Sequence, residues 1–369
     1  MTGTHPPPGP ASRDPSHGDE REKLRVLLVD DSPSVRAVLK RFFSWTDDID
    51  VVGEAPDGET GVEMVREVEP DVVLMDLVMP GMDGYAATER IMQVRPTPIV
   101  VLSSRANRNQ MRTAFEAMRR GAVEVLGKPE DTRSWRQLAD TLPEMVRTAA
   151  AARTEPQRRP VRRPRPVEVV TRTVRWVGVG ASTGGPAALR ELLDALPDHF
   201  PMTFLVVQHI TSGFEGGLAD WLNREFVPDV RLAEEGEEAQ PGTVRLAPAD
   251  AHLTLAPGGI LHLDRTSPPR SGHRPSADAL LSSLARSAPA ASAGVILTGM
   301  GSDGVEGLLE LRKAGGLTIA QDPATCVVHG MPRVAVERGA AEIELPPSQI
   351  ARYLAGSREP RRRRHGGAP

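Results

Sequence analysis

Cysteine and long apolar runs are what this 369-residue chain lacks. Cys326 is the only cysteine, so an internal disulfide and a cysteine-based zinc site are both excluded, and we expect this thiol to be a small buried residue. No apolar run is long enough to span a bilayer, and the Pro-, Gly- and Ser-rich start lacks the apolar segment of a signal peptide. These absences predict a cytoplasmic protein without membrane insertion.

Positive charge is concentrated in two stretches, although the formal net charge is only −4. Residues 153–175 hold eight arginines and two glutamates, and residues 356–369 hold five arginines and one glutamate. Both stretches contain proline and little apolar surface, as solvated linkers and tails do. We expect a disordered tail over residues 1–23, a linker over 151–174 and a basic tail over 356–369. Such arginines can touch nucleic acid or anionic lipid, but a plain tether is the simpler interpretation, and no nucleic-acid partner is expected.

Residues 24–150 alternate short apolar runs with helix-period segments. The runs LRVLLV, DVVGEA, DVVLMD, PIVVLS and VEVLG each precede one such segment, which gives five strands and five helices. This order predicts a doubly wound, five-stranded parallel sheet. In such sheets, functional residues gather at the carboxyl ends of the strands.

Polar residues stand at those strand ends. Asp30 and Asp31 close the first strand, Asp76 the third, Ser103 the fourth and Lys128 the fifth. Carboxylates brought together repel one another unless a cation or a proton intervenes, and oxygen ligands with room for water suit Mg²⁺. A lysine and a hydroxyl nearby suit phosphoryl oxygens. The pattern therefore predicts a site for Mg²⁺ and phosphate around a reactive carboxylate.

Residues 175–355 alternate strands and helices again. The runs WVGVGAS, TFLVVQHI, AGVILTG and LTIAQD predict parallel strands. Between Val230 and Arg265, short runs separated by the turn signals QPG, APAD and APGG predict antiparallel strands instead. We expect a mostly parallel α/β domain with an antiparallel insertion.

The turn GASTGGP, residues 180–186, follows the first of these strands. A Walker-type phosphate loop is excluded because no lysine follows the last glycine, and the glycines are out of register for a dinucleotide fingerprint. Gly180, Ser182 and Gly184 instead form G-x-S-x-G, which exposes a serine hydroxyl on a strained turn. Ser182 is a candidate nucleophile; a mere tight turn is the alternative.

A serine nucleophile needs a base and an acid that orients the base. His209 ends the next strand, so it reaches the same sheet edge as Ser182, and Asp303 lies in the glycine loop after AGVILTG. The order Ser, His, Asp differs from that of α/β-hydrolases, which disfavours an ordinary lipase or esterase. Position alone leaves other bases and acids open: His199, His252, His262, His273, His329, Asp250, Asp278 and Asp322.

The first domain resembles a response-regulator receiver domain, through VDDS, MDLVMPGMDG, LSS and GKP and through the interval of 52 residues from Asp76 to Lys128. The resemblance implies that Asp76 accepts a phosphoryl group from a histidine kinase. It implies that Asp30 and Asp31 organise Mg²⁺ with Asp76, and that Ser103 and Lys128 sense the phosphoryl group.

The second domain resembles the methylesterase domain of CheB-type chemotaxis proteins, through VGVGASTGGP, VVQHITSGF, HRPSADALLSSLA, ILTGMGSDGVEGL and TIAQDPATCVVHGMP. The resemblance implies that Ser182 is the nucleophile, His209 the base and Asp303 the orienting acid. Three further residues are expected to line the site or serve the oxyanion: Thr183, Met300 and His273.

Together the two resemblances imply a phosphorylation-activated hydrolase that removes methyl groups from glutamyl γ-methyl esters on chemoreceptor helices and also deamidates receptor glutamines. Its partners would be a chemotaxis-type histidine kinase and the methylated receptor, and the hydrolytic step would need no cofactor. Two alternatives are a receiver-controlled serine hydrolase of another ester or amide, and a receiver-linked binding module without catalysis.

Overall fold

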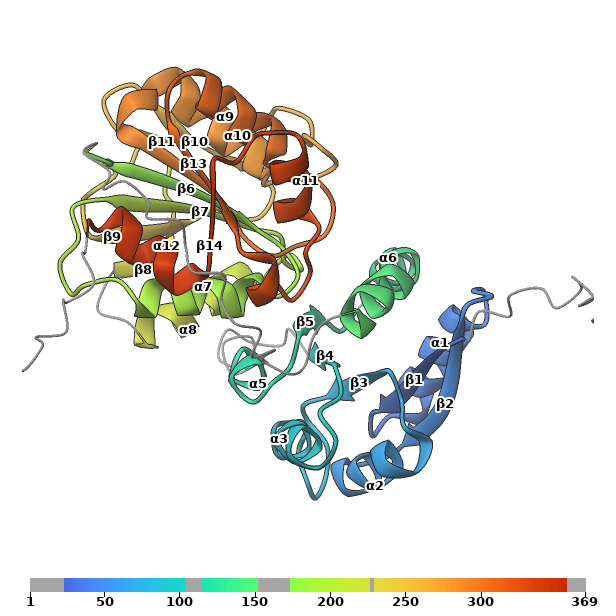
Figure 1. Ribbon diagram of the computed structural model, residues 1–369. Helices are drawn as coiled ribbons and strands as arrows, with labels where there is room; N and C mark the ends of the chain where they lie inside the picture. Colours follow the sequence, from blue (N-terminus) through green and yellow to red (C-terminus); the bar gives the residue numbers. More distant parts are fainter. Residues whose placement is uncertain (1–22, 104–113, 130, 152–172, 226–228, 357–369) are drawn as a thin grey trace, which may run out of the picture.

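The computed structural model describes residues 23–103, 114–129, 131–151, 173–225 and 229–356. Two tails were predicted at 1–23 and 356–369, and a linker at 151–174. Apart from residues 23, 151, 173–174 and 356, these segments lie outside the described residues. The described chain forms two α/β domains, each built on a parallel sheet (Figure 1). None of the described helices combines the length and the apolar character that a membrane span requires.

The N-terminal domain has five parallel strands in the order β2-β1-β3-β4-β5, which confirms the predicted doubly wound sheet. Its strands are β1 (Leu24–Val29), β2 (Ile49–Ala55), β3 (Val72–Asp76), β4 (Ile99–Ser103) and β5 (Glu124–Gly127). Its described helices are α1 (Pro33–Phe43), α2 (Gly58–Val68), α3 (Gly84–Val94), α5 (Glu116–Arg119) and α6 (Thr132–Ala150).

Both faces of this sheet are covered, which is why its strands read as continuous apolar runs. Side chains alternate along β1: Val26 and Leu28 pack with α1 and α6, whereas Leu27 and Val29 pack with α2 and α3. The helices therefore lie on two opposite faces and leave the carboxyl ends of the strands free for polar residues.

The C-terminal domain has seven parallel strands in the order β14-β13-β12-β6-β7-β9-β8. These strands are β6 (Trp176–Ala181), β7 (Thr203–Gln208), β8 (Asp229–Leu232), β9 (Thr243–Leu246), β12 (Ser292–Ile296), β13 (Leu317–Gln321) and β14 (Ile343–Leu345). The helices are α7 (Gly185–Asp194), α8 (Glu215–Glu225), α9 (Ala277–Ser287), α10 (Val305–Lys313), α11 (Met331–Glu337) and α12 (Pro347–Leu354), with short 3₁₀ turns η1 (Pro289–Ala291) and η2 (Pro323–Thr325).

The antiparallel insertion is confirmed, but it is smaller than the predicted segment from Val230 to Arg265. The strands β10 (His252–Ala256) and β11 (Ile260–Asp264) form an antiparallel hairpin separate from the main sheet, and Glu238 adds one antiparallel bridge to Ile260. The earlier strands β8 and β9 join the edge of the main sheet in parallel. Strands of only four residues carry no signal of their direction in the sequence, because either pairing satisfies the same apolar alternation.

Two glycines of β6 permit close packing of α9 on the sheet. A Cβ at Gly178 would lie 2.8 Å or less from Leu281 and Leu284, and one at Gly180 would lie 2.6 Å from Ala277. The apolar glycine-rich strand thus brings α9 close to the sheet, and the N-terminus of α9 close to the strand ends where the candidate site lies.

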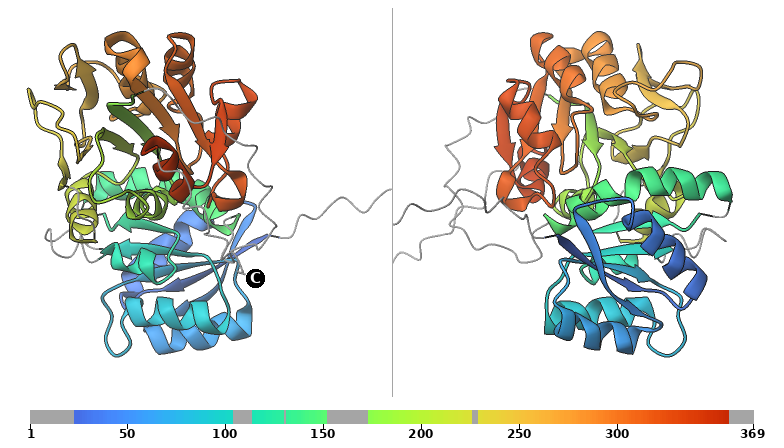
Figure 2. Two further views of the ribbon diagram at one scale, coloured as in Figure 1. Left: turned by 60° about the vertical axis from the view of Figure 1, so that its left-hand side comes forward. Right: turned by 90° about the vertical axis from the view of Figure 1, so that its right-hand side faces the viewer.

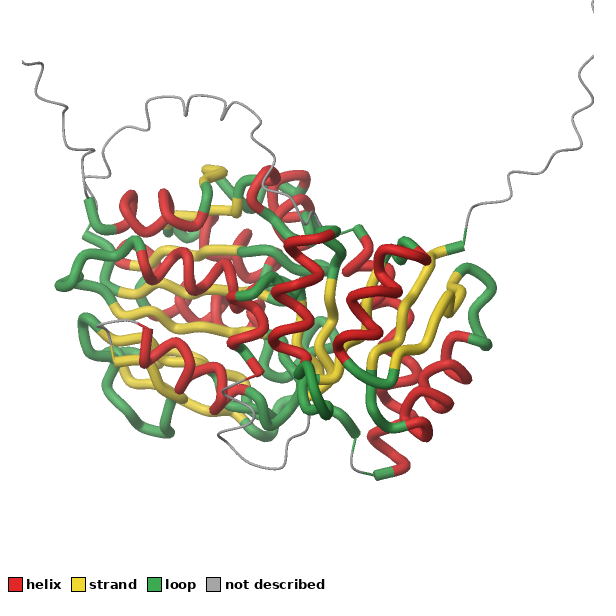
Figure 3. The backbone as a smooth tube through the Cα atoms, turned by 90° about the horizontal axis from the view of Figure 1, so that it is seen from below, coloured by secondary structure: helices red, strands yellow, loops and turns green. Residues whose placement is uncertain are grey.

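The two domains pack against each other through an apolar interface. Figure 2 shows α6, in green, between the blue N-terminal sheet and the C-terminal domain, and Figure 3 shows the two layered domains side by side. Phe115, just before α5, stacks on Trp221 of α8 at 5.8 Å between ring centroids and meets Phe214 edge-on at 6.4 Å. All three rings are fully buried, so this contact joins the domains through one continuous core.

Candidate active site

Three predicted side chains come together at the carboxyl ends of neighbouring strands. Ser182 directly follows β6 and His209 directly follows β7, the strand that pairs with β6 in parallel. Asp303 lies in the loop between β12, the other neighbour of β6, and α10. The parallel order β12-β6-β7 therefore places an acid, a serine and a histidine along one sheet edge.

Asp303 is a buried carboxylate held by four donors. His209 Nε2 lies 2.9 Å from its Oδ2, and the Ala277 N–H donates to the same oxygen at 2.7 Å. The Ser276 hydroxyl donates to Oδ1 at 2.7 Å and the Asp278 N–H at 3.1 Å. Burial alone would raise the pKa of Asp303, but the contact with His209 and the donors at the N-terminus of α9 lower it to about 2. The carboxylate is thus ionised and fixed opposite His209.

The two ring nitrogens of His209 are in different environments. Nε2 is engaged by Asp303, which favours the tautomer that carries its proton on Nε2. Nδ1 is buried and has no hydrogen-bond partner among the described residues. Nδ1 is therefore the nitrogen free to accept a proton. Ser182 and His209 share no hydrogen bond here; such contacts often tighten only when substrate is bound.

The backbone around Ser182 is held in a tight strand-to-helix turn. The Ser182 N–H donates to Thr298 O at 3.0 Å, and its carbonyl accepts from the Gly185 N–H at 2.7 Å. Gly184 has φ +75°, a left-handed conformation that favours glycine. The glycines thus shape the turn, and the serine hydroxyl remains available for chemistry.

The other predicted lining residues surround this pair. The His273 ring stacks on His209 with centroids 3.8 Å apart and planes 9° from parallel. Burial lowers the pKa of His273, with a smaller contribution from the adjacent His209, and this favours the neutral ring. Thr183 and Met300 line the same cavity as Ser182 and His209. The structure therefore brings all six predicted residues of this site together.

Four of the eight competing histidines and aspartates make other contacts. His252 Nε2 contacts Pro268 O at 3.1 Å, and His262 Nδ1 contacts Glu235 at 2.8 Å. Asp278 accepts from the Gly307 N–H and the Ser271 hydroxyl, and Asp322 caps η2. These contacts favour His209 and Asp303 over those four alternatives.

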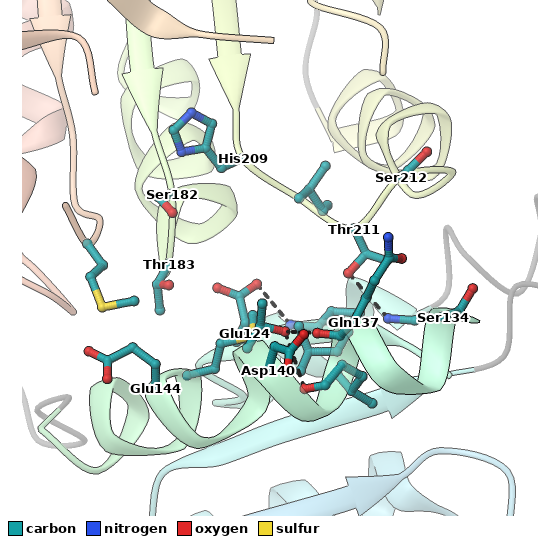
Figure 4. A pocket seen from close by; sticks show the side chains of 18 of the residues that line it. Glu124, Ser134, Gln137, Asp140, Glu144, Ser182, Thr183, His209, Thr211 and Ser212 are labelled. Atoms are coloured by element: carbon teal, nitrogen blue, oxygen red, sulfur yellow. Dashed lines mark hydrogen bonds between the residues drawn. The ribbon is translucent and has the colours of Figure 1, made fainter. Parts of the chain in front are cut away.

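The cavity beside Ser182 lies between the two domains and has a volume of about 670 Å³. Figure 4 shows Ser182, Thr183 and His209 on one wall and residues of β5 and α6 on the other. Contacts that join the walls include the Thr148 hydroxyl, 3.0 Å from Met300 Sδ, and the Gly127 N–H, which donates to the Thr211 hydroxyl at 3.5 Å. The N-terminal domain thus covers the mouth of the candidate active site.

Glu124, the first residue of β5, is a site residue that sequence analysis missed. Its side chain is buried in this interface beside Thr183 and Gly184, and it accepts a 3.1 Å hydrogen bond from the Val125 N–H. Burial raises its pKa to about 7, which these polar neighbours offset only in part. The signal in the sequence was a lone acid in the apolar run AVEVLG, where an unpaired charge would be costly.

Ser276 is a second missed residue. It is the N-cap of α9, and its hydroxyl also contacts Asp303. A serine before a helical pattern predicts a helix start, but nothing in the sequence connects that cap to an acid in a later loop.

A second polar site lies at the carboxyl ends of β1, β3 and β5 in the N-terminal domain. Asp30, Asp31 and Asp76 offer carboxylate oxygens within 4.8 Å of one another. Lys128 Nζ lies 2.7 Å from Asp30 and 2.5 Å from Asp76. Burial raises the pKa of Asp76, and the lysine offsets only part of that effect. Burial alone would lower the pKa of Lys128, but the carboxylates of Asp30 and Asp76 have the larger effect and raise this pKa.

Ser103 completes this cluster at the end of β4. It is buried, and its carbonyl accepts a 2.7 Å hydrogen bond from the Lys128 N–H, which brings the fourth and fifth strand ends together. Three clustered carboxylates with only one lysine between them suit a hard divalent cation such as Mg²⁺. The residues present therefore fit the predicted metal.

Comparison with known proteins agrees with this geometry. A family model described as CheB methylesterase matches residues 177–354, and one described as response regulator receiver domain matches residues 26–140. A protein-glutamate methylesterase/protein-glutamine glutaminase of Anaeromyxobacter dehalogenans is 41% identical over 90% of this chain and 98% of its own length. One from Myxococcus xanthus is 42% identical over 92% of this chain and 98% of its own length.

A solved structure is also similar to part of the chain. The CheB methylesterase catalytic domain of Thermotoga maritima is 40% identical, with a TM-score of 0.48, over 50% of this chain and 98% of that domain. The two family models cover both domains, and the curated relatives match over nearly their full length. The chain therefore belongs to the protein-glutamate methylesterase/protein-glutamine glutaminase family, in which a response regulator receiver domain precedes a CheB methylesterase domain.

Proposed function

We propose that this protein is a phosphorylation-activated hydrolase of glutamyl γ-methyl esters on chemoreceptors. The observation that carries the proposal is the contact between His209 and the buried Asp303, 2.9 Å apart, beside the turn that presents Ser182 to the cavity. This arrangement supplies a base, its orienting acid and a hydroxyl nucleophile, which together suit acyl transfer. A binding module would have no need of it.

The first half of the reaction forms an ester on the enzyme. Ser182 Oγ attacks the γ-carbonyl carbon of the substrate, and its proton passes to His209 Nδ1, the nitrogen that Asp303 leaves free. Asp303 stabilises the resulting imidazolium. When the tetrahedral intermediate collapses, the C–OCH₃ bond breaks and His209 returns the proton to the leaving methoxy oxygen. Methanol departs, and the glutamyl group stays on Ser182.

The second half releases the product. Water attacks the glutamyl-Ser182 carbonyl while His209 Nδ1 takes one of its protons; the C–Oγ bond then breaks, and the proton returns to Ser182. The backbone N–H of Thr183, the residue after the nucleophile, and one from the Met300 loop would stabilise the oxyanion. One such donor is typically worth about 10²- to 10³-fold in kcat. A receptor glutamine would follow the same route with ammonia as the leaving group.

Control would come from the receiver domain, which covers the active-site cavity. Asp76 would accept a phosphoryl group from a chemotaxis-type histidine kinase, and Lys128 and Ser103 would bind its oxygens. Asp30, Asp31 and Asp76 would hold Mg²⁺, which supplies positive charge to the phosphoryl oxygens. Lys128 would exchange its contacts with Asp30 and Asp76 for the phosphoryl group, and this change near β5 would weaken the interface that β5 and α6 make.

Methanol release from membranes that carry methylated chemoreceptors tests the proposal. The full chain, with a small phosphodonor and Mg²⁺, should release methanol, and Ser182→Ala should lower the rate by at least about 10³-fold without loss of folding. Ser212 lines the same cavity, so Ser212→Ala is a matched control that should retain activity. Undiminished release by Ser182→Ala would overturn the assignment.

A further inference from the structure

Gln208 is a buried amide placed between the candidate nucleophile and the candidate base. It is the last residue of β7, pairs with Ala181 of β6, and is 6% exposed. Its Nε2 donates to Ser182 O at 2.8 Å and to His209 O at 2.9 Å. One amide group therefore binds the backbone carbonyls of both residues.

These two bonds continue the sheet beyond the end of its ladder. The last backbone bond between the strands runs from the His209 N–H to Ala181 O at 2.9 Å. Past that point the chain turns into α7 on one side and into the loop before α8 on the other. The ladder itself no longer fixes where Ser182 and His209 lie relative to each other. The Gln208 amide supplies one further cross-link at this position.

Packing holds the amide in place. Its carbonyl carbon and oxygen lie so close to Gly185 that a Cβ there would be 2.0 Å from Oε1 and 2.8 Å from Cδ. Oε1 is buried without a hydrogen-bond partner among the described residues. A buried unsatisfied acceptor is unfavourable and calls for an explanation, and an apolar side chain would avoid it. The two bonds made by Nε2 provide that explanation.

We propose that Gln208 is a positioning residue for catalysis: its amide holds the Ser182 turn and the backbone of His209 in register, so that Oγ and Nδ1 meet when substrate binds. The inference rests on the proposed function, because it concerns the serine and histidine of that reaction. Gln208 contacts neither substrate nor the reacting atoms, and it acts through the two residues that do. A misplacement of about 1 Å between such groups can cost about 10²-fold in rate.

The experiment replaces the amide in the full chain and measures methanol release with phosphodonor and Mg²⁺. Gln208→Met keeps the length of the side chain and removes both donors; we expect kcat to fall about 10- to 100-fold with KM unchanged. A fluorophosphonate probe, which reacts with the serine hydroxyl without a receptor substrate, should label Ser182 more slowly by a similar factor. Gln208→Asn shortens the side chain, so its amide cannot reach both carbonyls. Its kcat and labelling rate should lie between those of the wild type and Gln208→Met, and it tests the proposal if Gln208→Met folds poorly.

Thr203→Val is the matched control. Thr203 begins the same strand, is buried, and donates one side-chain hydrogen bond, to Gln240 O at 2.7 Å, at the end of β7 away from the site. This variant should lose thermal stability while kcat and the labelling rate stay within about twofold of wild type. Wild-type kcat and labelling in Gln208→Met or Gln208→Asn would overturn the positioning role alone. A wild-type chain without Ser182-dependent methanol release would overturn the proposed function, and with it the role assigned to Gln208.

Discussion

The carboxyl group of Glu124 in the receiver lies beside the side chain of Thr183, the residue that follows Ser182 in the hydrolase domain. The Gly184 N–H is a second neighbour of this carboxyl, and all four residues belong to the region where the two domains meet. The receiver thus places an ionisable group, with a pKa raised to about 7 by burial, against the turn that carries the candidate nucleophile. Inhibition by the receiver is therefore expected to depend on pH as well as on phosphorylation.

We expect the unphosphorylated full chain to be more strongly inhibited at pH 6 than at pH 8. Burial in the docked structure raises the pKa of Glu124 from its ordinary 4.5 to about 7. Docking therefore takes up a proton if undocking exposes this carboxyl to water. The bound proton stabilises the docked state by at most about 3 kcal/mol. This stabilisation is fully present below pH 4.5, the ordinary pKa, and is lost as the pH rises through about 7. The measurement is the ratio of methanol release without and with phosphodonor at pH 6, 7 and 8, because the ratio cancels the titration of the catalytic groups.

Glu124→Gln separates this effect from other titrations. The Gln side chain is neutral throughout the range and its carbonyl oxygen can accept the same hydrogen bonds, so the ratio should become flat with pH and stay low at pH 8. Asp140 and Glu144 of α6 line the same cavity, and Asp140→Asn should keep the pH dependence of the wild type. A flat ratio in the wild-type chain would contradict the assignment to Glu124.

A second prediction concerns the aromatic contact between the domains. Phe115→Leu removes the stacking on Trp221 and the edge contact with Phe214, which are worth about 0.5–1.5 kcal/mol each beyond the buried area. The docked state should weaken, and unphosphorylated activity should rise several-fold. Phe43→Leu, in the receiver core on α1, is the matched control: it should lower receiver stability and leave unphosphorylated activity near that of the wild type. Equal activation by both variants would show receiver unfolding rather than a weakened interface.

Removal of the metal or the phosphoacceptor should abolish activation and spare the hydrolytic step. Asp76→Ala deletes the proposed acceptor, and chelation with EDTA deprives the carboxylate cluster of Mg²⁺. In both cases we expect methanol release to be the same with and without phosphodonor, at the unphosphorylated wild-type rate. The hydrolase site is built from Ser182, His209 and Asp303 and needs no metal in the proposed route. If chelation abolished methanol release by the unphosphorylated chain, this would contradict the prediction that the hydrolytic step needs no metal.

The parallel sheets and the strand-end residues were predictable because they follow from local patterns. Apolar runs alternating with helical segments predicted the parallel sheets, and parallel strands necessarily bring their carboxyl ends to one edge. That rule alone predicts Ser182 near His209 and Asp76 near Lys128. The direction of β8 and β9 could not be predicted, since strands of four residues fit either pairing.

Contacts that depend on packing between distant elements were not predictable. Ser276 could be identified as a cap but not as a partner of Asp303, because that contact needs α9 to sit close to Gly178 and Gly180. Glu124 could be identified as unusual in an apolar run, but its partners Thr183 and Gly184 belong to the other domain. In both cases the missing information was the arrangement of whole helices and domains.

The last prediction tests whether Ser276 serves the helix or the active site. Ser276→Ala removes the N-cap of α9 and one of the four donors on Asp303, so we expect a loss of about 1 kcal/mol in stability and a lower kcat. Asp303, with its pKa lowered to about 2, contributes stability that is present above its ordinary value of 3.8 and is lost as the pH falls through about 2. Loss of a donor raises that pKa, so the variant should lose stability at higher pH than the wild type during acid unfolding.

Ser276→Gly distinguishes the two roles of the hydroxyl. Glycine is tolerated at an N-cap at a cost of only a few tenths of a kcal/mol, but it lacks the donor as completely as alanine does. If the hydroxyl orients Asp303, both variants should show the same reduced kcat although Ser276→Gly is the more stable. If the hydroxyl serves only the helix, kcat should follow stability, and Ser276→Gly should recover wild-type turnover. Thermal unfolding and methanol release, measured on the same preparations with phosphodonor and Mg²⁺, decide between these outcomes.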